Sequence, residues 1–205
     1  MSCFDYAQDD ILWLKDDIED AVHYFMQNTN TLQQYDQVVA HCKHIFIQKA
    51  QDYGTSWRVL RTISVVDQIF IKAQRIKTIQ EKKAQQVEDG IAAEFQGIIN
   101  YSVIGLIQLE KGSDIVEDLP AATITLWYDE KITQAKNIML QKNHDYGEAW
   151  RLMSEESFTD LILMKILRIK QILTNEGKTL ISEGIDANYV DILNYAIFAS
   201  ILMSN

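Results

Sequence analysis

Residues 142–170 read KNHDYGEAWRLMSEESFTDLILMKILRIK, and residues 49–77 read KAQDYGTSWRVLRTISVVDQIFIKAQRIK. The two stretches are copies of one another at a constant offset of 93 positions. When residues 35–77 are aligned with 128–170, 18 of 43 positions are identical. Each copy joins a polar turn, DYGxxWR, to a mostly apolar helix that carries KxxR. A repeat of this kind predicts a tandem duplication of one structural unit.

Few of the identical residues are the aliphatic ones that a shared core alone would demand. They include Lys49/Lys142, Asp52/Asp145, Tyr53/Tyr146, Gly54/Gly147, Trp57/Trp150, Arg58/Arg151, Asp67/Asp160, Lys72/Lys165 and Arg75/Arg168. The duplication therefore predicts a charged site that is built twice.

The length and composition of the chain suit a globular protein. Its 205 residues include 47% hydrophobic residues, which is enough to bury a core as one large domain or as two units of about 100 residues. No window holds the roughly 18 uninterrupted apolar residues of a membrane span, because Asp191 and Asn194 interrupt the richest run. The two cysteines, Cys3 and Cys42, are far apart and fall in no metal or redox spacing, so a disulfide framework is not expected. We therefore expect a cytoplasmic protein without a membrane partner.

The net charge argues against one large class of ligand. The chain has 29 acidic residues against 19 lysines and arginines, which gives −10. A nucleic-acid polymer needs a basic surface to neutralise its phosphates. A small phosphorylated ligand needs only one or two local cations or a bound divalent metal. We therefore expect a small phosphorylated partner such as a nucleotide, and no nucleic-acid polymer.

The two copies divide the chain into segments. Seven acidic residues and a single lysine, Lys15, fall within residues 1–34, and this part has no equivalent before the second copy. The expected segments are an acidic N-terminal extension over residues 1–30, a first repeat over 31–110, a linker over 111–120 and a second repeat over 121–205. Because Met26 lies just before the first repeat, we expect residues 1–25 to be dispensable.

Apolar residues recur at helical spacing in both repeats. We expect helices at about residues 31–49, 64–83 and 92–109 in the first repeat, and at about 121–142, 157–175 and 187–203 in the second. Gly54 and Gly147 should end the first helix of each repeat, and Ser64 and Ser157 should cap the second helix. The sequence therefore predicts an all-α fold: a tandem duplication of a three-helix unit with approximate two-fold symmetry and one shared helical core.

The second helix of each repeat carries two cations on a largely apolar surface. Lys165 and Arg168 share a stripe with apolar neighbours, and Lys72 and Arg75 are their equivalents. A buried cation needs a carboxylate, a ligand anion or a path to water. The pair therefore indicates either an internal salt-bridge network or an anion or nucleotide site.

The third helix of the second repeat places polar residues among apolar ones. They are Asn188, Asp191, Asn194 and Tyr195, and their equivalents in the first repeat, at an offset of 94, are Glu94, Gly97, Asn100 and Tyr101. Asp191 therefore has no acidic equivalent. If Asp191 is only a counter-ion, then Lys72 and Arg75 must pair differently, for instance with Glu94. The asymmetry predicts that the second repeat holds the principal site and the first a supporting or vestigial one.

The DYGxxWR turn combines an acceptor, a phenol, an indole and a guanidinium within seven residues. An aromatic plane beside an arginine suits a nucleotide; the alternative is that the tryptophans anchor the core. The candidate ligand-binding residues are Tyr146, Trp150, Arg151, Lys165, Arg168, Asn188, Asn194 and Tyr195 in the second repeat, and Tyr53, Arg58, Lys72 and Arg75 in the first. Asp191 and Asp145 are the candidate catalytic residues, and Asp191 is the candidate ligand for a Mg²⁺ ion.

These motifs resemble those of a known family. The pattern KxxDYGxxWR, SxxD, KxxR and a final DxxNYA (Asp191, Asn194, Tyr195 and Ala196) is similar to the nucleotide modification associated domain family, first type, in its two-copy bacterial form. The resemblance covers about residues 31–203. It implies a link to nucleotide modification but no defined reaction. The helical layout is also similar to all-α nucleoside triphosphate pyrophosphatases of the MazG type, whose ExxE helix this chain lacks.

Two functions are compatible with these residues. The first is a nucleotide-binding helical protein that acts in nucleotide modification or hydrolyses a small phosphorylated nucleotide, with the cations on phosphate and with Mg²⁺ or a water at Asp191. The second is a non-catalytic structural or binding module whose repeated charges form a buried salt-bridge network. The number of carboxylates separates the two, because two-metal hydrolysis needs several that converge. Either function is compatible with a homodimer.

Overall fold

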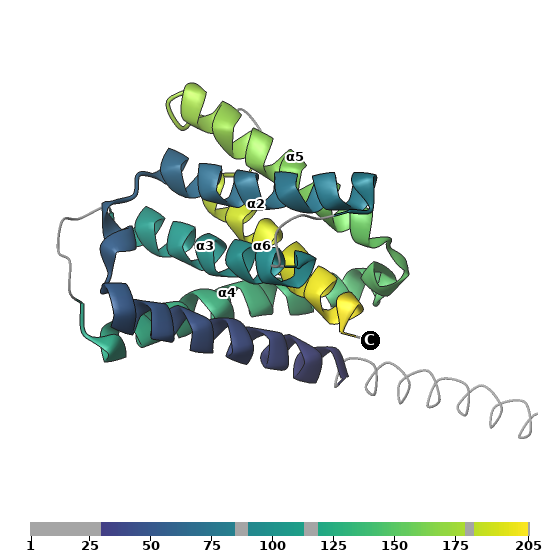
Figure 1. Cartoon of the computed structure of the whole chain (residues 1–205), viewed down its shortest axis with the longest axis horizontal. Helices are drawn as coiled ribbons and strands as arrows, with labels where there is room; N and C mark the ends of the chain where they lie inside the picture. Colours follow the sequence, from purple (N-terminus) through teal and green to yellow (C-terminus); the bar gives the residue numbers. More distant parts are fainter. Residues whose placement is uncertain (1–29, 85–89, 113–118, 179–182, 205) are drawn as a thin grey trace, which may run out of the picture.

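The structure of the protein is a computed structural model that describes residues 30–84, 90–112, 119–178 and 183–204. Within these ranges every regular element is a helix (Figure 1). The first helix covers residues 30–53, and the others are η1 (Ser56–Val59), α2 (Thr62–Lys82), α3 (Ile91–Lys111), α4 (Ala121–Tyr146), η2 (Ala149–Leu152), α5 (Glu155–Thr174) and α6 (Ile185–Met203). The all-α prediction is confirmed. Of the expected acidic extension, only residue 30 is described, and most of the expected linker lies outside the described residues.

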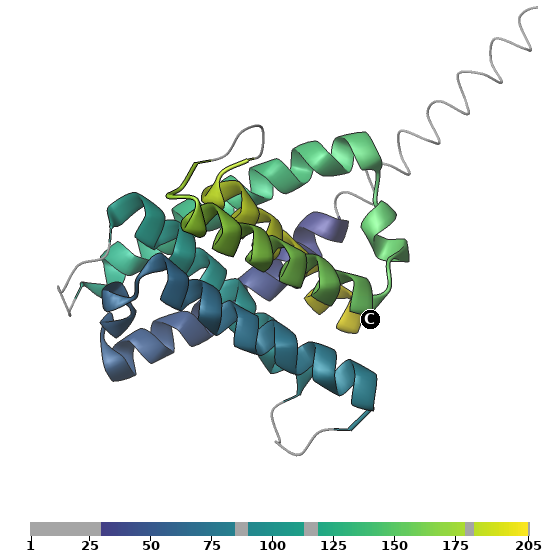
Figure 2. The same cartoon turned by 90° about the horizontal axis from the view of Figure 1, so that it is seen from above.

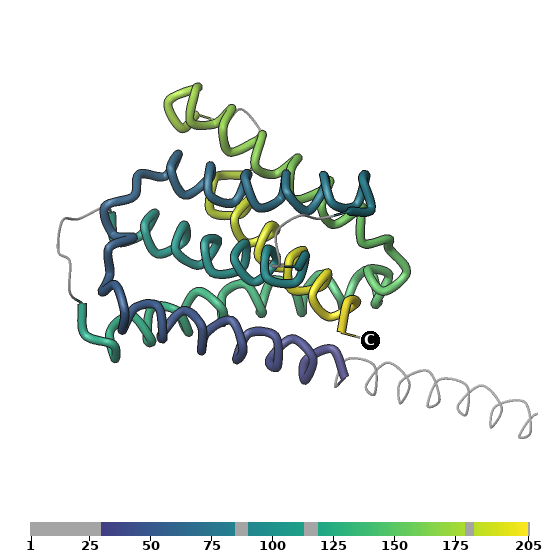
Figure 3. The backbone as a smooth tube through the Cα atoms, in the orientation of Figure 1, coloured from purple at the N-terminus to yellow at the C-terminus, as the bar shows by residue number. Residues whose placement is uncertain are grey.

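Each repeat contributes the same four elements in the same order. The first helix, η1, α2 and α3 correspond to α4, η2, α5 and α6. The turns that carry η1 and η2 lie at opposite ends of the molecule (Figures 1 and 2). The tube in Figure 3 shows each repeat running along its first helix, turning at the η helix and returning along the second. The predicted duplication of a helical unit is therefore confirmed.

The helices form three layers, and α3 and α6 make the central one (Figure 1). On one side α2 packs on α3, α5 packs on α6, and α2 and α5 contact each other. The first helix and α4 form the layer on the opposite side, where α4 contacts both α3 and α6. α6 is buried on almost every side, as expected for a helix with so few polar residues. The buried residues of both repeats form one hydrophobic core. No helix in the described part of the chain has the length and apolar character that crossing a membrane requires.

The helices before the DYG turns extend further than predicted. The first helix runs on to residue 53 and α4 to Tyr146, so the aspartate and tyrosine of each DYG motif belong to the last helical turn. The glycine ends the helix as predicted, with φ angles of 63° at Gly54 and 60° at Gly147. The η helix that follows carries the tryptophan and arginine of each motif.

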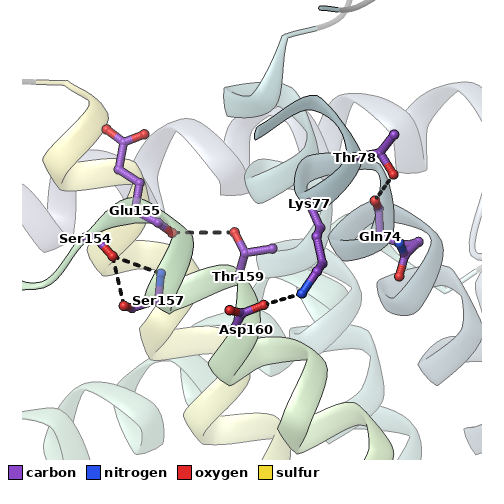
Figure 4. Close-up of polar contacts among 8 residues, drawn as sticks. All are labelled: Gln74, Lys77, Thr78, Ser154, Glu155, Ser157, Thr159 and Asp160. Atoms are coloured by element: carbon purple, nitrogen blue, oxygen red, sulfur yellow. Dashed lines mark hydrogen bonds and ion pairs between the residues drawn. The ribbon is translucent and has the colours of Figure 1, made fainter. Parts of the chain in front are cut away.

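The predicted caps of the second helices are wrong. The N-cap of α5 is Ser154, whose hydroxyl accepts a hydrogen bond from the backbone N–H of Ser157 at 3.3 Å (Figure 4). Ser157 therefore lies inside the first turn. Ser64 is likewise inside α2, which begins at Thr62. Ser154 can cap because its backbone is extended and its side chain can reach back to the third residue of the helix.

Two ion pairs join the first helix to α4 and reveal how the repeats are related. Lys43 lies 2.7 Å from Asp129, and Lys136 lies 2.6 Å from Asp36. Lys136 and Asp129 are the equivalents of Lys43 and Asp36 at the offset of 93. The second pair is therefore the first pair with the two repeats exchanged, which is the signature of a two-fold relationship.

The same exchange occurs between α2 and α5. Lys77 contacts Asp160 at 2.8 Å (Figure 4), and Lys170 contacts Asp67 at 2.7 Å. These four residues are again related by the offset of 93. The two-fold relationship therefore holds in the outer layer that lies on the opposite side of the core.

Buried hydrogen bonds repeat the pattern inside the core. The Tyr35 hydroxyl donates to Oδ1 of Asn194 at 3.0 Å, and the Tyr128 hydroxyl donates to Oδ1 of Asn100 at 2.9 Å. Each asparagine also donates from Nδ2 to a helix carbonyl of its own repeat. Tyr35 and Tyr128 are fully buried. Each asparagine thus fixes the first helix of its own repeat and the tyrosine of the other.

Candidate functional site

The tyrosines of the two DYG turns are exposed. The exposed fraction of Tyr53 is 69% and that of Tyr146 is 76%. Asp145 is also at the surface, where its carboxylate contacts the imidazole of His144 at 3.1 Å. Tyr53 and Tyr146 are therefore accessible to a ligand, whereas Asp145 interacts with its neighbour in the chain.

Arg58, by contrast, is buried and held by the fold. Its guanidinium donates to Oε1 of Gln108 on α3 and lies 5.8 Å from the ring of Trp57 and 5.7 Å from that of Trp127. Gln108 in turn donates to the carbonyls of Arg58 and Leu60 at 2.8 and 2.9 Å. These contacts give Arg58 a structural role in joining η1 to α3 and α4.

Arg151 also makes structural contacts. Its guanidinium donates to the side chains of Thr31 at 2.6 Å and Gln34 at 2.7 Å on the first helix, and also to the carboxylate of Glu148. It lies 4.3 Å from the ring of Trp150. The repeated arginines therefore connect the η helices to neighbouring elements.

A cavity of about 500 Å³ lies beside the DYG turn of the first repeat. The first helix, the turn, α2 and α3 all contribute to its wall. The residues that matter for binding a charged ligand are Lys49, Tyr53, Trp57, Lys72, Glu94 and Tyr101. Lys49 makes no ion pair with any residue in the described part of the chain. The principal site was predicted in the second repeat, whereas this cavity lies in the first.

Glu94 is the acid that the cations of the first repeat share. Its carboxylate lies 3.1 Å from Nζ of Lys72 and also contacts the guanidinium of Arg75. Gly97, one turn further along α3, leaves room for the lysine: a Cβ atom built there would lie 2.6 Å from Cε of Lys72. Lys72 therefore passes across Gly97 to reach Glu94. If Asp191 is a counter-ion in the second repeat, the sequence predicts that Lys72 and Arg75 pair with another acid, such as Glu94. The structure contains this pairing.

In the second repeat the acid is Asp191, and its two oxygens face two lysines. Oδ1 accepts from Lys142 at 2.6 Å, and Oδ2 accepts from Lys165. Lys165 and Asp191 are both nearly fully buried, whereas the Lys142 side chain is half exposed. Burial lowers the pKa of Lys142, but the hydrogen bond to Asp191 and the negative charge of that carboxylate together outweigh burial, so the pKa is raised overall. A metal ion at Asp191 would have to displace two ammonium groups.

Arg168 and Tyr195 lie at the edge of this cluster. Burial, and then the Asp191 carboxylate, raise the pKa of the Tyr195 phenol, while Lys142 and Arg168 oppose that shift. Arg168 is exposed and makes no ion pair with a described residue. The expectation that Lys165 and Arg168 share one stripe of the helix is therefore wrong as far as burial is concerned, since Lys165 is buried and Arg168 is exposed. The two positions lie about 60° apart around the helix, which places Arg168 beyond the buried face.

The remaining candidates of the second repeat are buried. Trp150 stacks on Phe198, with ring centroids 4.3 Å apart and planes 7° from parallel. Asn194 makes the buried hydrogen bonds described above. Asn188 donates from Nδ2 to the carbonyl of Gly184 at 2.7 Å, and its Oδ1 has no partner among the described residues. No three histidine, cysteine, aspartate or glutamate side chains come together as a metal site within residues 30–84, 90–112, 119–178 and 183–204.

The sequence-based list of ligand-binding residues omitted four positions that define the two clusters. Lys49 and Lys142 are identical between the copies but are not among the predicted ligand-binding residues, although identity three positions before the aspartate of each DYG motif was a usable signal. In the sequence, Glu94 and Gly97 stand out only as the equivalents of Asn188 and Asp191. Their importance depends on how α2 and α3 face each other, which the sequence does not specify.

The comparisons with known proteins agree with the repeat. No curated protein and no solved structure matches the chain. One family model matches twice, over residues 49–109 and 142–203. Each match begins at the lysine before a DYG turn and ends in the third helix of its repeat. The two matches together cover more than half of the chain, so the protein belongs to the nucleotide modification associated domain 1 family.

Proposed function

We propose that the protein binds a small phosphorylated nucleotide in the cavity of the first repeat. The observation that carries the proposal is that Lys49 lines this cavity together with Lys72 and makes no ion pair with a described residue. Among the described residues of the wall, Glu94 is the only one with a carboxylate. A chain with a net charge of −10 that keeps two lysines against one acid in a cavity is suited to an anion.

The aromatic residues of the wall support a nucleotide over a simple anion. Tyr53, Trp57 and Tyr101 surround the same cavity as the lysines. Aromatic rings provide stacking surfaces for a base, and lysine provides a compact charge for a phosphate. A volume of about 500 Å³ falls within the range of small-molecule sites. The family's association with nucleotide modification points to the same class of ligand.

The function that the described residues support is binding of a nucleotide. Two-metal hydrolysis of a nucleotide needs several carboxylates that converge on the metals. The part of the chain that the structure describes brings no such group together. Chemistry on the nucleotide would therefore require groups other than the paired Asp191 and the surface Asp145.

A thermal-shift screen of deoxynucleoside mono- and triphosphates, with and without Mg²⁺, tests the proposal. A ligand that binds only the native state at 100 times its Kd stabilises it by about 2.7 kcal/mol, so we expect at least one member of the panel to raise the Tm. Calorimetric titration should then show binding at least about tenfold weaker for Lys49→Met and for Lys72→Met.

Lys43→Met is the matched control, because Lys43 lies on the same helix but pairs with Asp129 away from the cavity. It should bind the nucleotide as the unchanged protein does. A panel without any stabilising nucleotide would overturn the proposal, as would unchanged binding by both cavity variants.

The alternative function is a structural module in which the repeated charges form an internal network. The ion pairs of Lys72 and Arg75 with Glu94, and of Lys165 with Asp191, favour it. Such a network has no use for Lys49. Under this alternative, Lys49→Met changes neither stability nor ligand response, and no nucleotide raises the Tm.

A further inference from the structure

The lysine before the DYG turn has opposite surroundings in the two repeats. Lys49 lines the cavity of the first repeat without an ion pair to a described residue. Its equivalent, Lys142, crosses from α4 to Asp191 on α6, at 2.6 Å. The same side chain is therefore available to a ligand in one repeat and bound to the protein's own carboxylate in the other.

The acids of the two clusters lie one helical turn apart on equivalent helices. Glu94 has Asn188 as its equivalent, and Gly97 has Asp191. In the first repeat the glycine keeps this place free for the side chain of Lys72. In the second repeat the carboxylate of Asp191 fills it and holds Lys165 and Lys142. The position of one acid along the third helix thus decides where both lysines go.

The tryptophans of the two repeats also differ in whether they face a cavity or the protein itself. Trp57 lines the cavity beside Ile104. Phe198 replaces Ile104 in the second repeat, and it covers Trp150 with a parallel stack at 4.3 Å. The aromatic surface that faces the first cavity is therefore covered by the protein itself in the second repeat.

The second repeat nevertheless retains polar groups at the positions of a cavity wall. Nδ2 of Asn143, Nε1 of Trp150 and Oδ1 of Asn188 are buried and have no hydrogen-bond partner among the described residues. All three side chains are more than nine-tenths buried. Their equivalents, Ala50, Trp57 and Glu94, all line the first cavity. Because buried polar groups are normally satisfied, these atoms indicate that the second repeat keeps polar positions of a cavity wall without the partners that such positions normally have.

We propose that the second repeat is a closed copy of the nucleotide site, and that Asp191 closes it by drawing Lys142 and Lys165 inward. This inference rests on the function proposed for the first repeat. It implies that the chain binds one nucleotide, although its sequence contains the site twice.

Exchanging the two acid positions between the repeats tests the inference. The double variant Asn188→Glu/Asp191→Gly gives the second repeat the arrangement of the first. The reverse variant, Glu94→Asn/Gly97→Asp, gives the first repeat the arrangement of the second, and only the flexible end of Lys72 lies in the way of the new side chain. Each is titrated calorimetrically with the nucleotide that raises the Tm of the unchanged protein most.

We expect one bound nucleotide per chain for the unchanged protein, two for Asn188→Glu/Asp191→Gly, and none for Glu94→Asn/Gly97→Asp. In the first double variant, Lys142→Met should remove the added nucleotide and Lys49→Met the original one. Circular dichroism and a cooperative melt establish that each variant is folded, and the reverse exchange decides the question if the first variant does not fold.

The two proposals fail in different ways. Absence of binding by the unchanged protein overturns the function proposed for the first repeat. Binding of two nucleotides by the unchanged protein, with one lost in Lys49→Met and the other in Lys142→Met, overturns the closed copy while the proposed function stands. A folded Asn188→Glu/Asp191→Gly variant that still binds one nucleotide overturns the closing role of Asp191.

Discussion

Lys165 on α5 and Asp191 on α6 form an ion pair in which both side chains are almost completely buried, with exposed fractions of 9% and 7%. Removing one partner of a buried pair costs about 3–5 kcal/mol, because the other charge stays buried. Lys142 would remain as a partner for Asp191. We therefore expect Lys165→Met to lower the free energy of unfolding by about 3 kcal/mol, which is the lower limit of that range.

Arg168→Met is the matched control for this prediction. Arg168 lies one turn further along α5 but is exposed, so its replacement should change the free energy of unfolding by less than about 0.5 kcal/mol. Urea melts of the two variants measure the difference. Equal losses in the two variants would contradict the assignment of Lys165 as the partner of Asp191.

Asn194 and Asn100 should contribute similarly to stability, because each joins the two repeats through a buried tyrosine. Replacing either by alanine leaves a tyrosine hydroxyl without its acceptor, and the penalty for such a group is about 1–3 kcal/mol. Thermal or urea melts of Asn100→Ala and Asn194→Ala should show losses in this range. Phe replacement of the tyrosine in the same background should recover part of the loss. A large effect in one variant alone would show that the two contacts are not equivalent.

Much of the fold could be predicted from the sequence, because its evidence is local or periodic. The offset of 93 established the duplication, and the apolar spacing located the helices. The ends of the helices were harder to predict from the sequence. Ser154 and Ser157 are both reasonable caps by residue type, and only the backbone conformation distinguishes them. The reciprocal pairs, such as Lys43 with Asp129, join residues far apart in the chain, so no local pattern could reveal them.

Acid should destabilise the protein partly through Glu110 on α3. Hydrogen bonds from Lys111 and Lys131 lower the pKa of this carboxyl to about 2 from its ordinary 4.5. A carboxyl with a lowered pKa in the folded state stabilises the fold above its unfolded pKa, and this contribution disappears as the pH falls through the folded value.

The variant Glu110→Gln tests this contribution. It should be less stable than the unchanged protein at neutral pH, and the difference should narrow as the pH falls from about 4.5 to about 2. The effect should be modest, because the Glu110 side chain is nearly half exposed and solvent screens its ion pairs. A difference in free energy of unfolding that stays constant over this pH range would refute the prediction.

Cys42 should be protected from thiol reagents in the native state. It is fully buried, and burial raises its pKa to about 12. The reactive species is the thiolate. In a Cys3→Ser variant, we expect modification by a maleimide or a disulfide reagent at pH 8 to be at least about 100-fold slower than in concentrated urea. Similar rates in the two conditions would mean that the first helix does not pack on the core as described.

The candidate site was less predictable than the fold. The residue types were correct, since Lys72, Arg75, Lys165 and Asp191 all take part in the two clusters. Their pairing depends on the path of the Lys72 side chain over Gly97 and on the distance between Lys142 on α4 and Asp191 on α6. Both are consequences of helix packing, which residue spacing does not encode.

The reciprocal contacts between the repeats have a consequence for how the two halves could diverge. Both halves use the same surface to contact each other, as the subunits of a symmetric homodimer do. In a homodimer encoded by one short gene, every substitution appears in both subunits at once. Covalent fusion of the halves removes that restriction. The first repeat has Glu94 and Gly97 where the second has Asn188 and Asp191, and a homodimer of identical halves could not carry this difference.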